Sequence, residues 1–419
     1  MNRGKEARPA TIAVIGAGII GLCTAANLQR KGLQVTVLDP MPPGTNATYG
    51  NGGMISTAAI TPVALPGMLR KVPKWLRDPE GPLFVAPRYL PVALPWLMRW
   101  VRAGALDQVR HAAEALHHLH DHAITEYRQL LGPEHFNSVV KVLGQVHMWD
   151  NKEWPESEKI AAAFRDQYGI ATEELSPERL RDMLPELATS VSRALYFPNN
   201  GHTTNPLRLA QVIHGLFMDD AGQSLREKVL RITPEDGRYR LWTNCGDHIF
   251  DQVVVAGGAW SLDLLAPLGL GFPLETERGY HVQIANPKIE VAYPILHKGR
   301  GFGGSMMEDG LRLGGTVEIA GLDMPPNPRR IQAIQKHAKV VQPRLDLSEY
   351  KVWMGFRPST PDSLPVMGES RRHPGLHIAC GHGHLGITGG AASGRLMAEI
   401  ITKSPTFIDP TPYRLERFL

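Results

Sequence analysis

The chain has 419 residues, of which 43% are hydrophobic and 21% charged, and a formal net charge of +4. This composition is typical of a globular protein of two or three domain-sized parts, and it excludes a disordered chain, a collagen and a coiled coil. The nearly balanced charge gives no case for nucleic acid as a partner, and no apolar run reaches the roughly 18 residues that a membrane-spanning helix needs.

The cysteines and the N-terminus suggest a cytoplasmic protein. Three widely separated cysteines, Cys23, Cys245 and Cys380, form no CxxC pair, so we expect neither a disulfide framework nor a structural zinc site. Basic residues precede the apolar segment 11–26, as in a secretory signal. That segment carries three ordered glycines and leads into a second strand that ends in an acid, which opposes secretion.

The first 40 residues contain a dinucleotide-binding pattern. A short apolar strand, Thr11–Ile15, enters the sequence GAGIIG, which is followed by an apolar helical run to about Arg30 and by the strand 35–38. In such a turn the first glycine allows the tight bend, the second admits a pyrophosphate, and the third lets the helix pack closely on the strand. An acid at the end of the second strand can accept hydrogen bonds from ribose hydroxyls. The candidate cofactor-binding residues here are Gly16, Gly18, Ile19, Ile20, Gly21 and Asp39.

The cofactor could be NAD, NADP or FAD on these residues alone, but Asp39 disfavours NADP because it would repel the extra phosphate. The segment 46–56 that follows is small and flexible. It can either lay backbone N–H groups along a long cofactor or form an ordinary surface loop.

The remaining chain alternates between strand and helix patterns. We expect a Pro-, Trp- and Arg-rich stretch at 61–105, a long helix at 106–131, a strand at 145–149, helices opened by Ser176-Pro177 and Asn205-Pro206, a hairpin around 244–247, a buried strand at 253–256 before Gly257, alternating strands at 279–318, a helix at 328–341, and a strand at 377–380 before a helix at 386–401.

These patterns predict an α/β fold of two interleaved domains. A Rossmann-like nucleotide-binding domain is expected from residues 1–60, 195–272 and 353–419. A mainly antiparallel β-plus-helix substrate domain is expected from residues 61–194 and 273–352. Ligands of open α/β sheets bind beyond the carboxyl ends of the strands, so the turns after Ile15, Ala256 and Cys380 should converge.

Four separated segments resemble the FAD-dependent D-amino-acid oxidase superfamily, and most closely its bacterial D-amino-acid dehydrogenase (small subunit type) branch. They are GAGIIG, VVVAGGAWS, GFRPSTPDSLPVMGES and CGHGHLGITGGAASGRLMAEI. The resemblance spans the chain and implies FAD as the cofactor and oxidation of an amine that carries a carboxylate. It adds these expected cofactor contacts: Asn51, Gly52, Gly53, Met54, Ile55, Val229, Gly257, Trp260, Gly383, His384, Leu385, Gly386, Ile387 and Thr388.

The candidate catalytic residues are Arg357, Tyr280, His202 and His384. Arg357 suits a carboxylate clamp, because a guanidinium is always charged and can donate two parallel hydrogen bonds. Tyr280 matches the superfamily's active-site tyrosine region but could equally be a packing residue. The two histidines could face the substrate, or His384 could serve in a helix cap or the core.

No metal site is expected. His118 and His122 have the i, i+4 spacing of a zinc pair but lack a third ligand at a recognisable position, so a solvated helix face is the better interpretation. Cys380, His382 and His384 alternate directly after a strand, which fits metal ligation poorly.

We therefore expect oxidative deamination of a D-amino or imino acid, with D-proline and hydroxyproline as candidates, by hydride transfer from Cα to flavin N5 and onward transfer of the electrons to a quinone-type acceptor. A sarcosine- or glycine-oxidase-like enzyme that uses oxygen and an FAD-carrying electron-transfer subunit are the alternatives. Residues 66–102 combine aromatic, apolar and basic side chains, Trp96 and Trp100 among them, and could contact the inner face of the plasma membrane without crossing it. The alternative is a lid packed under the substrate domain.

Overall fold

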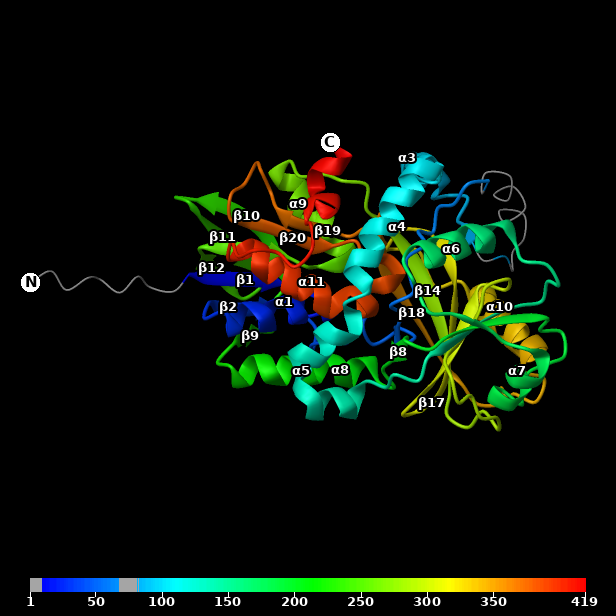
Figure 1. Ribbon diagram of the computed structural model, residues 1–419. Coiled ribbons are helices and arrows are strands. Elements are labelled where there is room, and N and C mark those ends of the chain that lie inside the picture. The colour runs from blue at the N-terminus through cyan, green and yellow to red at the C-terminus, as the bar shows by residue number, and fades with distance from the viewer. Residues whose placement is uncertain (1–9, 68–80, 82) are drawn as a thin grey trace, which may run out of the picture.

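The computed structural model describes residues 10–67, 81 and 83–419. One half of the molecule is built on a six-stranded sheet in the order β19-β20-β13-β1-β2-β9 (Figure 1). All neighbours in it are parallel except the edge pair β19 and β20. The strands are β1 (Thr11–Ile15), β2 (Gln34–Leu38), β9 (Gln223–Leu225), β13 (Gln252–Val255), β19 (Val366–Glu369) and β20 (Leu376–Cys380). Their apolar residues are buried, as expected of parallel strands covered on both faces.

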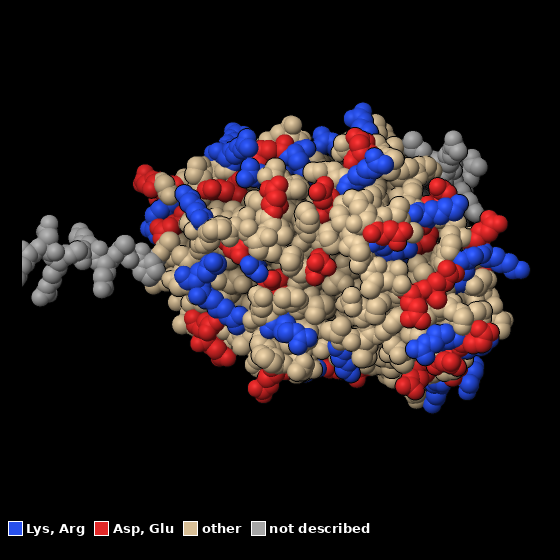
Figure 2. Space-filling view, in the orientation of Figure 1, with Lys and Arg blue, Asp and Glu red and all other residues tan. Residues whose placement is uncertain are grey.

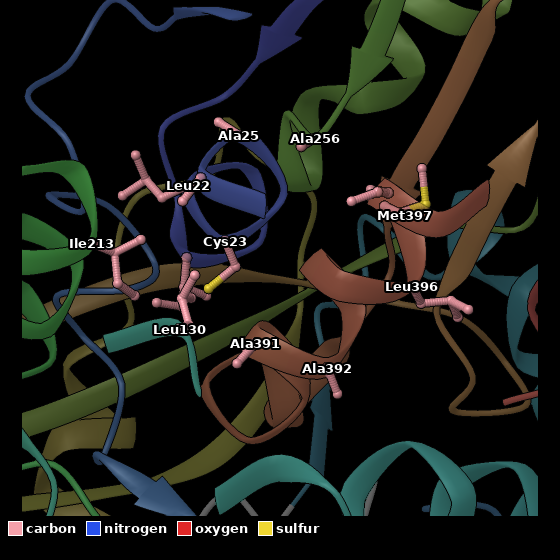
Figure 3. Packing of buried hydrophobic residues seen from close by; sticks show 14 of the residues in the cluster. Leu22, Cys23, Ala25, Leu130, Ile213, Ala256, Ala391, Ala392, Leu396 and Met397 are labelled. Carbon is pink, nitrogen blue, oxygen red and sulfur yellow. The ribbon is translucent and has the colours of Figure 1, made fainter. Parts of the chain in front are cut away.

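Helices cover this sheet and form the largest core of the described chain. They are α1 (Ile19–Arg30), α4 (Leu106–His120), α5 (Ala123–Val139), α8 (Pro206–Asp219) and α11 (Gly386–Ile401). Figure 3 shows Cys23 of α1 and Ala391 and Ala392 of α11 among the buried residues of this core. A Cβ at Gly394 would lie 2.5 Å from the backbone of Cys23, so small residues set the spacing of these two helices.

The other half is built on a nine-stranded sheet in the order β18-β14-β17-β16-β15-β5-β7-β6, with β4 beside β17. Its strands are β4 (Leu83–Val85), β5 (Gln145–Trp149), β6 (Glu173–Glu174), β7 (Arg193–Phe197), β14 (Glu275–Ile284), β15 (Ile295–His297), β16 (Phe302–Met307), β17 (Gly310–Ile319) and β18 (Lys351–Ser359). Helix α10 (Pro328–Val341) packs on one face with Ile334 and Ala338 in a second core. The opposite face lies toward the first half of the molecule.

Smaller elements complete the fold. They are α3 (Leu90–Ala103), α6 (Glu156–Gln167), α7 (Pro177–Met183), α9 (Ser261–Leu265), the ribbon of β3 (Met54–Ile55) with β8 (Gly201–His202), and the meander β10 (Val229–Glu235), β11 (Arg238–Thr243) and β12 (Gly246–Phe250). Short 3-10 turns cover η2 (Gly258–Trp260), η3 (Ala266–Leu268), η4 (Gly383–Leu385), η5 (Thr411–Tyr413) and η6 (Leu415–Phe418).

The α/β class is confirmed, but several expected boundaries lie elsewhere. Strands β18 and β7 both belong to the second sheet. A boundary at residue 353 therefore cuts through β18, and a boundary at residue 195 cuts through β7. Helices α4 and α5, expected in the substrate domain, pack with α1 and α11, because their apolar faces complete that core. The expected helix at 106–131 is interrupted at Asp121, and the turn at 244–247 joins β11 to β12.

The surface carries both charge signs. Basic and acidic side chains are interspersed over the face shown in Figure 2. No helix within the described ranges has the length and apolar character required to cross a bilayer.

Candidate active site

The turn after β1 has the geometry of a phosphate-binding turn. Gly16 has φ +113°, and a Cβ there would overlap the carbonyl of Ala256, while a Cβ at Gly21 would overlap the carbonyl of Gly16. Both positions therefore require glycine. A Cβ at Gly18 would meet only the hydroxyl of Thr48, at 3.7 Å, so the backbone there is approachable.

Asp39 faces this turn from the end of β2. Its Oδ2 accepts a hydrogen bond from the N–H of Ala17 at 2.7 Å, and its Oδ1 accepts one from Met41 at 2.8 Å. Burial raises the pKa of Asp39, and the two backbone donors partly offset this. Thr48, which the sequence reasoning missed, accepts from the N–H of Ile19 at 3.0 Å. Its signal was its place in the small-residue segment 46–56.

The segment after Tyr49 is fixed by the second sheet. Arg312 of β17 donates to the carbonyls of Tyr49 and Asn51 at 2.6 and 2.9 Å, and Nδ1 of His281 lies 3.1 Å from the carbonyl of Gly50. Asn51 accepts from the N–H of Gly53 at 2.8 Å. Arg312 and His281 could not be identified from the sequence, because about 230 to 260 residues separate them from the loop they hold.

The same segment reaches the start of α11. Thr388 accepts from the N–H of Ser56 at 3.1 Å and donates to the carbonyl of Met54 at 3.3 Å. Met54 and Ile55 pair with His202 and Gly201 in the β3–β8 ribbon. Segments 51–56 and 383–388, both expected at the cofactor, are therefore brought together.

The other expected cofactor residues lie at the same end of the parallel sheet. Gly257 follows β13, and the ring of Trp260 lies edge-on to Phe356 of β18 at 5.6 Å. Val229 is buried in one apolar cluster with Ile15 and Leu38, the residues that end β1 and β2. The turns after β1, β13 and β20 thus converge as predicted.

These residues fit FAD. Gly16 and Gly21 keep the turn after β1 tight, because a Cβ at either position would overlap a backbone carbonyl. The approachable backbone at Gly18 and the open space beside Gly52, where a Cβ would meet nothing within 4 Å, suit a pyrophosphate and a long cofactor. When bound, the cofactor would be held by the β1–α1 turn, Asp39, segment 51–55 and the start of α11.

Arg357 lies on the face of the second sheet that meets this region. Its guanidinium occupies the space above Gly279 of the neighbouring strand, where a Cβ would overlap it. It donates to the carbonyl of Thr316 at 3.2 Å. Burial lowers the pKa of Arg357 and the carboxylate of Glu277 partly restores it, but a guanidinium remains charged.

Glu277 is the cross-strand neighbour of Arg357 and is 5% exposed. Its Oε2 lies 2.5 Å from Nε2 of His384, which comes from the loop before α11. Burial raises the pKa of Glu277, but His384 and Arg357 outweigh burial, so its pKa is lowered overall. The sequence reasoning selected Arg357 and His384 but missed this carboxylate, since nothing in the motif around it marks it.

Tyr280 does not lie beside Arg357, Glu277 and His384. Side chains alternate along a strand, so Tyr280 points away from the face that carries Glu277, Gly279 and His281. It is buried in the core beneath α10, where its hydroxyl bonds to Glu318 and accepts from the N–H of Asn327. Its expected catalytic role is therefore corrected to a packing role.

The remaining histidine candidates lie apart from one another, with His202 opposite Met54 in the β3–β8 ribbon. His202 is 5% exposed, and its pKa is lowered to about 4 by burial and by Lys141. His118 lies in the last turn of α4, whereas His122 precedes α5 beyond the break and contacts Phe407. No group of three potential ligands that could hold a metal ion occurs in the described part of the chain.

The expected membrane segment is only partly described, because residues 68–80 and 82 lie outside the described residues. Trp96 and Trp100 are 6% and 5% exposed and pack with Val85 and Ile319. The indole of Trp96 also donates to the carbonyl of Ser359 at 3.2 Å. These two tryptophans are therefore core residues and not membrane anchors.

Comparison with known proteins agrees with this geometry. Residues 11–400 match the family model described as DAO, FAD dependent oxidoreductase. The chain belongs to this family. A "D-amino-acid oxidase" from Bradyrhizobium diazoefficiens is 33% identical over 416 residues, covering 97% of this chain and 99% of the relative. A "D-amino acid dehydrogenase" from Xylella fastidiosa is 29% identical, with coverage of 97% and 95%.

Solved structures share the fold. Glycine oxidase from Geobacillus kaustophilus has a TM-score of 0.73 at 21% identity and covers 98% of this chain and 100% of its own. The structure of L-proline dehydrogenase from P. horikoshii has a TM-score of 0.75 at 20% identity, with 98% coverage of both chains. The protein is thus an FAD-dependent oxidoreductase of the amino acid oxidase and dehydrogenase type.

Proposed function

We propose that the protein oxidises a D-amino or imino acid at Cα and passes the electrons to a quinone-type acceptor. The observation that carries this proposal is the placement of Arg357 above Gly279, on the sheet face that meets the expected cofactor residues. FAD, when bound, supplies a hydride acceptor at its N5 atom. The product imine would hydrolyse to a 2-oxo acid or persist when cyclic.

Two parts of the chain have separate roles in this reaction. Arg357 grips the substrate carboxylate with two parallel hydrogen bonds and so fixes the direction of the Cα–H bond. The backbone from Gly383 to Thr388 and the N-terminus of α11 provide a positive field where negative charge accumulates during the reaction. The dehydrogenase and oxidase names of the relatives support the reaction class.

An anaerobic screen tests this proposal. Purified yellow protein should bleach with a D-amino or imino acid such as D-proline or hydroxyproline, and the L-isomers and N-methylglycine should react more slowly. Failure of every amine to bleach the flavin would instead favour an FAD-carrying subunit. Heating should release FAD into the supernatant, since the proposal includes non-covalent binding.

The acceptor is tested separately. Reoxidation of the bleached protein by a quinone analogue should outpace reoxidation by oxygen. The reverse order would favour the oxygen-using alternative, for which the glycine oxidase fold neighbour is a precedent.

We further propose that α3 contacts an anionic membrane surface on the cytoplasmic side. Its outer face exposes Val92, Leu94 and Met98, at 63%, 49% and 50%, beside the exposed Arg99 and Arg102. No acidic residue occurs between Leu83 and Leu106. An apolar and cationic helix face of this kind suits a layer of acidic headgroups.

Liposome flotation tests this contact. Wild type should float with anionic vesicles at low salt and less at high salt, and a Val92→Ser/Leu94→Ser/Met98→Ser variant should not float. Trp96 and Trp100 are unsuitable for this test because they are buried. If wild type stays at the bottom of the gradient at low salt, the contact is wrong.

A further inference from the structure

The site places a buried carboxylate beside the carboxylate clamp. Glu277 and Arg357 face each other across β14 and β18, yet each is hydrogen-bonded elsewhere. The guanidinium donates to the carbonyl of Thr316, and the carboxylate bonds to His384. A cationic and an anionic side chain on neighbouring strands, each hydrogen-bonded to a third group, form a complement to a zwitterion.

Resting on the proposed function, we propose that Glu277 binds the substrate ammonium and accepts its proton, and that His384 is the positioning residue that orients the Glu277 carboxylate. An α-amino or imino acid carries its nitrogen on the carbon next to its carboxylate. With the carboxylate on Arg357, the nitrogen must therefore lie within a few ångströms of that clamp, and Glu277 is the residue that pairs with Arg357 across the two strands.

The step balances in atoms and electrons. One N–H bond of the ammonium breaks, its proton passes to the carboxylate of Glu277, and its electron pair stays on nitrogen. The Cα–H bond then breaks, the hydrogen leaves with both electrons, for which FAD would be the acceptor when bound, and the nitrogen lone pair forms the C=N bond. The amine loses two electrons and the flavin gains them.

The surroundings of Glu277 suit this role. Arg357 faces Glu277 from β18, and His384 faces it from the loop before α11. On β14 itself, Glu275 lies two residues before Glu277 and His281 lies four residues after it. Glu275 is engaged by the hydroxyl of Tyr89 at 3.2 Å. The two cationic or potentially cationic neighbours lower the pKa of Glu277, so its carboxylate is ionised at neutral pH and can pair with the substrate ammonium.

The test compares the pH dependence of anaerobic flavin bleaching in holoenzyme variants. Wild type should bleach at a nearly constant rate through neutral pH. Glu277→Gln should lose about 100-fold at pH 7 and regain roughly tenfold per pH unit, because only the already neutral amine can react. His384→Gln should show an intermediate profile. Glu275→Gln, the matched control, should keep the wild-type profile.

A ligand test distinguishes a specific effect from damage to the fold. Cyclopentanecarboxylate has a carboxylate but no amine, and its binding can be followed by the change in flavin absorbance. Removing the negative charge should make Glu277→Gln bind this probe more tightly than wild type, whereas a disrupted site would bind it more weakly.

Two results would overturn the proposal: a wild-type pH profile in Glu277→Gln, or weaker binding of cyclopentanecarboxylate by that variant. Failure of the proposed function is recognised separately, since wild type itself would then not bleach with any amino or imino acid.

Discussion

Arg357 gives the most direct test at the scale of single residues. Arg357→Ala should leave a folded, yellow protein but cost about 2–4 kcal/mol of transition-state stabilisation, since a charge-assisted bidentate contact is lost from a shielded site. Arg357→Lys should recover only part of this loss, because an ammonium cannot form the planar fork. Steady-state kinetics measure both changes, and near-normal turnover by the alanine variant would contradict the assignment.

Gly279 tests the placement of that guanidinium without removing it. A methyl group at Gly279 would overlap the guanidinium of Arg357, the mobile end of a flexible side chain, so Gly279→Ala should displace the clamp and spare the fold. We expect KM to rise about tenfold or more with FAD retained. Gly314→Ala is the control on the adjacent strand, because its Cβ would meet nothing closer than 3.8 Å. Equal KM values for the two variants would show that Arg357 is not held above Gly279.

Single residues were predictable where a local motif marks them. Gly16, Gly21 and Asp39 stand at fixed spacing in one strand–turn–helix–strand unit, and the structure brings them together. Glu277 was not predictable, because its role depends on strands β14 and β18 being neighbours, and its partners Arg357 and His384 lie 80 and 107 residues further along the chain. The predicted catalytic role of Tyr280 was wrong for a related reason, since only the pairing register decides which face of a strand meets the site.

At the scale of elements, the closest approach of α1 and α11 controls packing in the nucleotide-binding half. Gly394→Ala would place a methyl group 2.5 Å from the backbone of Cys23, which cannot move as a side chain can. We expect a loss of about 1–3 kcal/mol in the free energy of unfolding and weaker retention of FAD, because α11 begins at the expected cofactor site. Denaturant titration and the flavin content of the purified protein measure these effects.

Gly215 of α8 supplies the matched control for that substitution. A Cβ there would meet nothing within 4 Å, so Gly215→Ala should be neutral or stabilise the protein by up to about 1 kcal/mol through its better helix propensity. If both alanine variants were equally stable, the small residues between α1 and α11 would not set the spacing of the helices.

Elements with strong local signals were well predicted, including the strand β1, the helix opened by Asn205 and the unit β20–α11. The domain to which each element belongs was not well predicted. Helices α4 and α5 follow a segment that joins the second sheet, but their apolar faces complete the core beneath α1 and α11. Sequence order cannot show which of two available surfaces a helix covers, because that choice is made by long-range packing.

At the scale of the whole molecule, buried histidines predict a strong dependence of stability on acid. Burial lowers the pKa of His120, His202 and His281 to about 4. In the unfolded chain a histidine titrates near pH 6.5. Between these two values the unfolded state binds more protons than the native state, so stability falls as the pH drops from about 6.5 toward 4 and the loss levels off below that.

We therefore expect the melting temperature to be steady above pH 7 and to fall clearly by pH 5, with roughly 1–2 kcal/mol lost for each such histidine. His120 lies on α4 with Nδ1 2.8 Å from the carbonyl of Ala59. His120→Gln should make the decline less steep even if it lowers stability at pH 7, because one buried titrating group is gone. His118→Gln is the control, since the exposed ring of His118 lies in water in both states. Thermal melts of the three proteins from pH 4.5 to 8 measure the slopes, and a steeper or unchanged decline in His120→Gln would show that its burial does not govern the acid response.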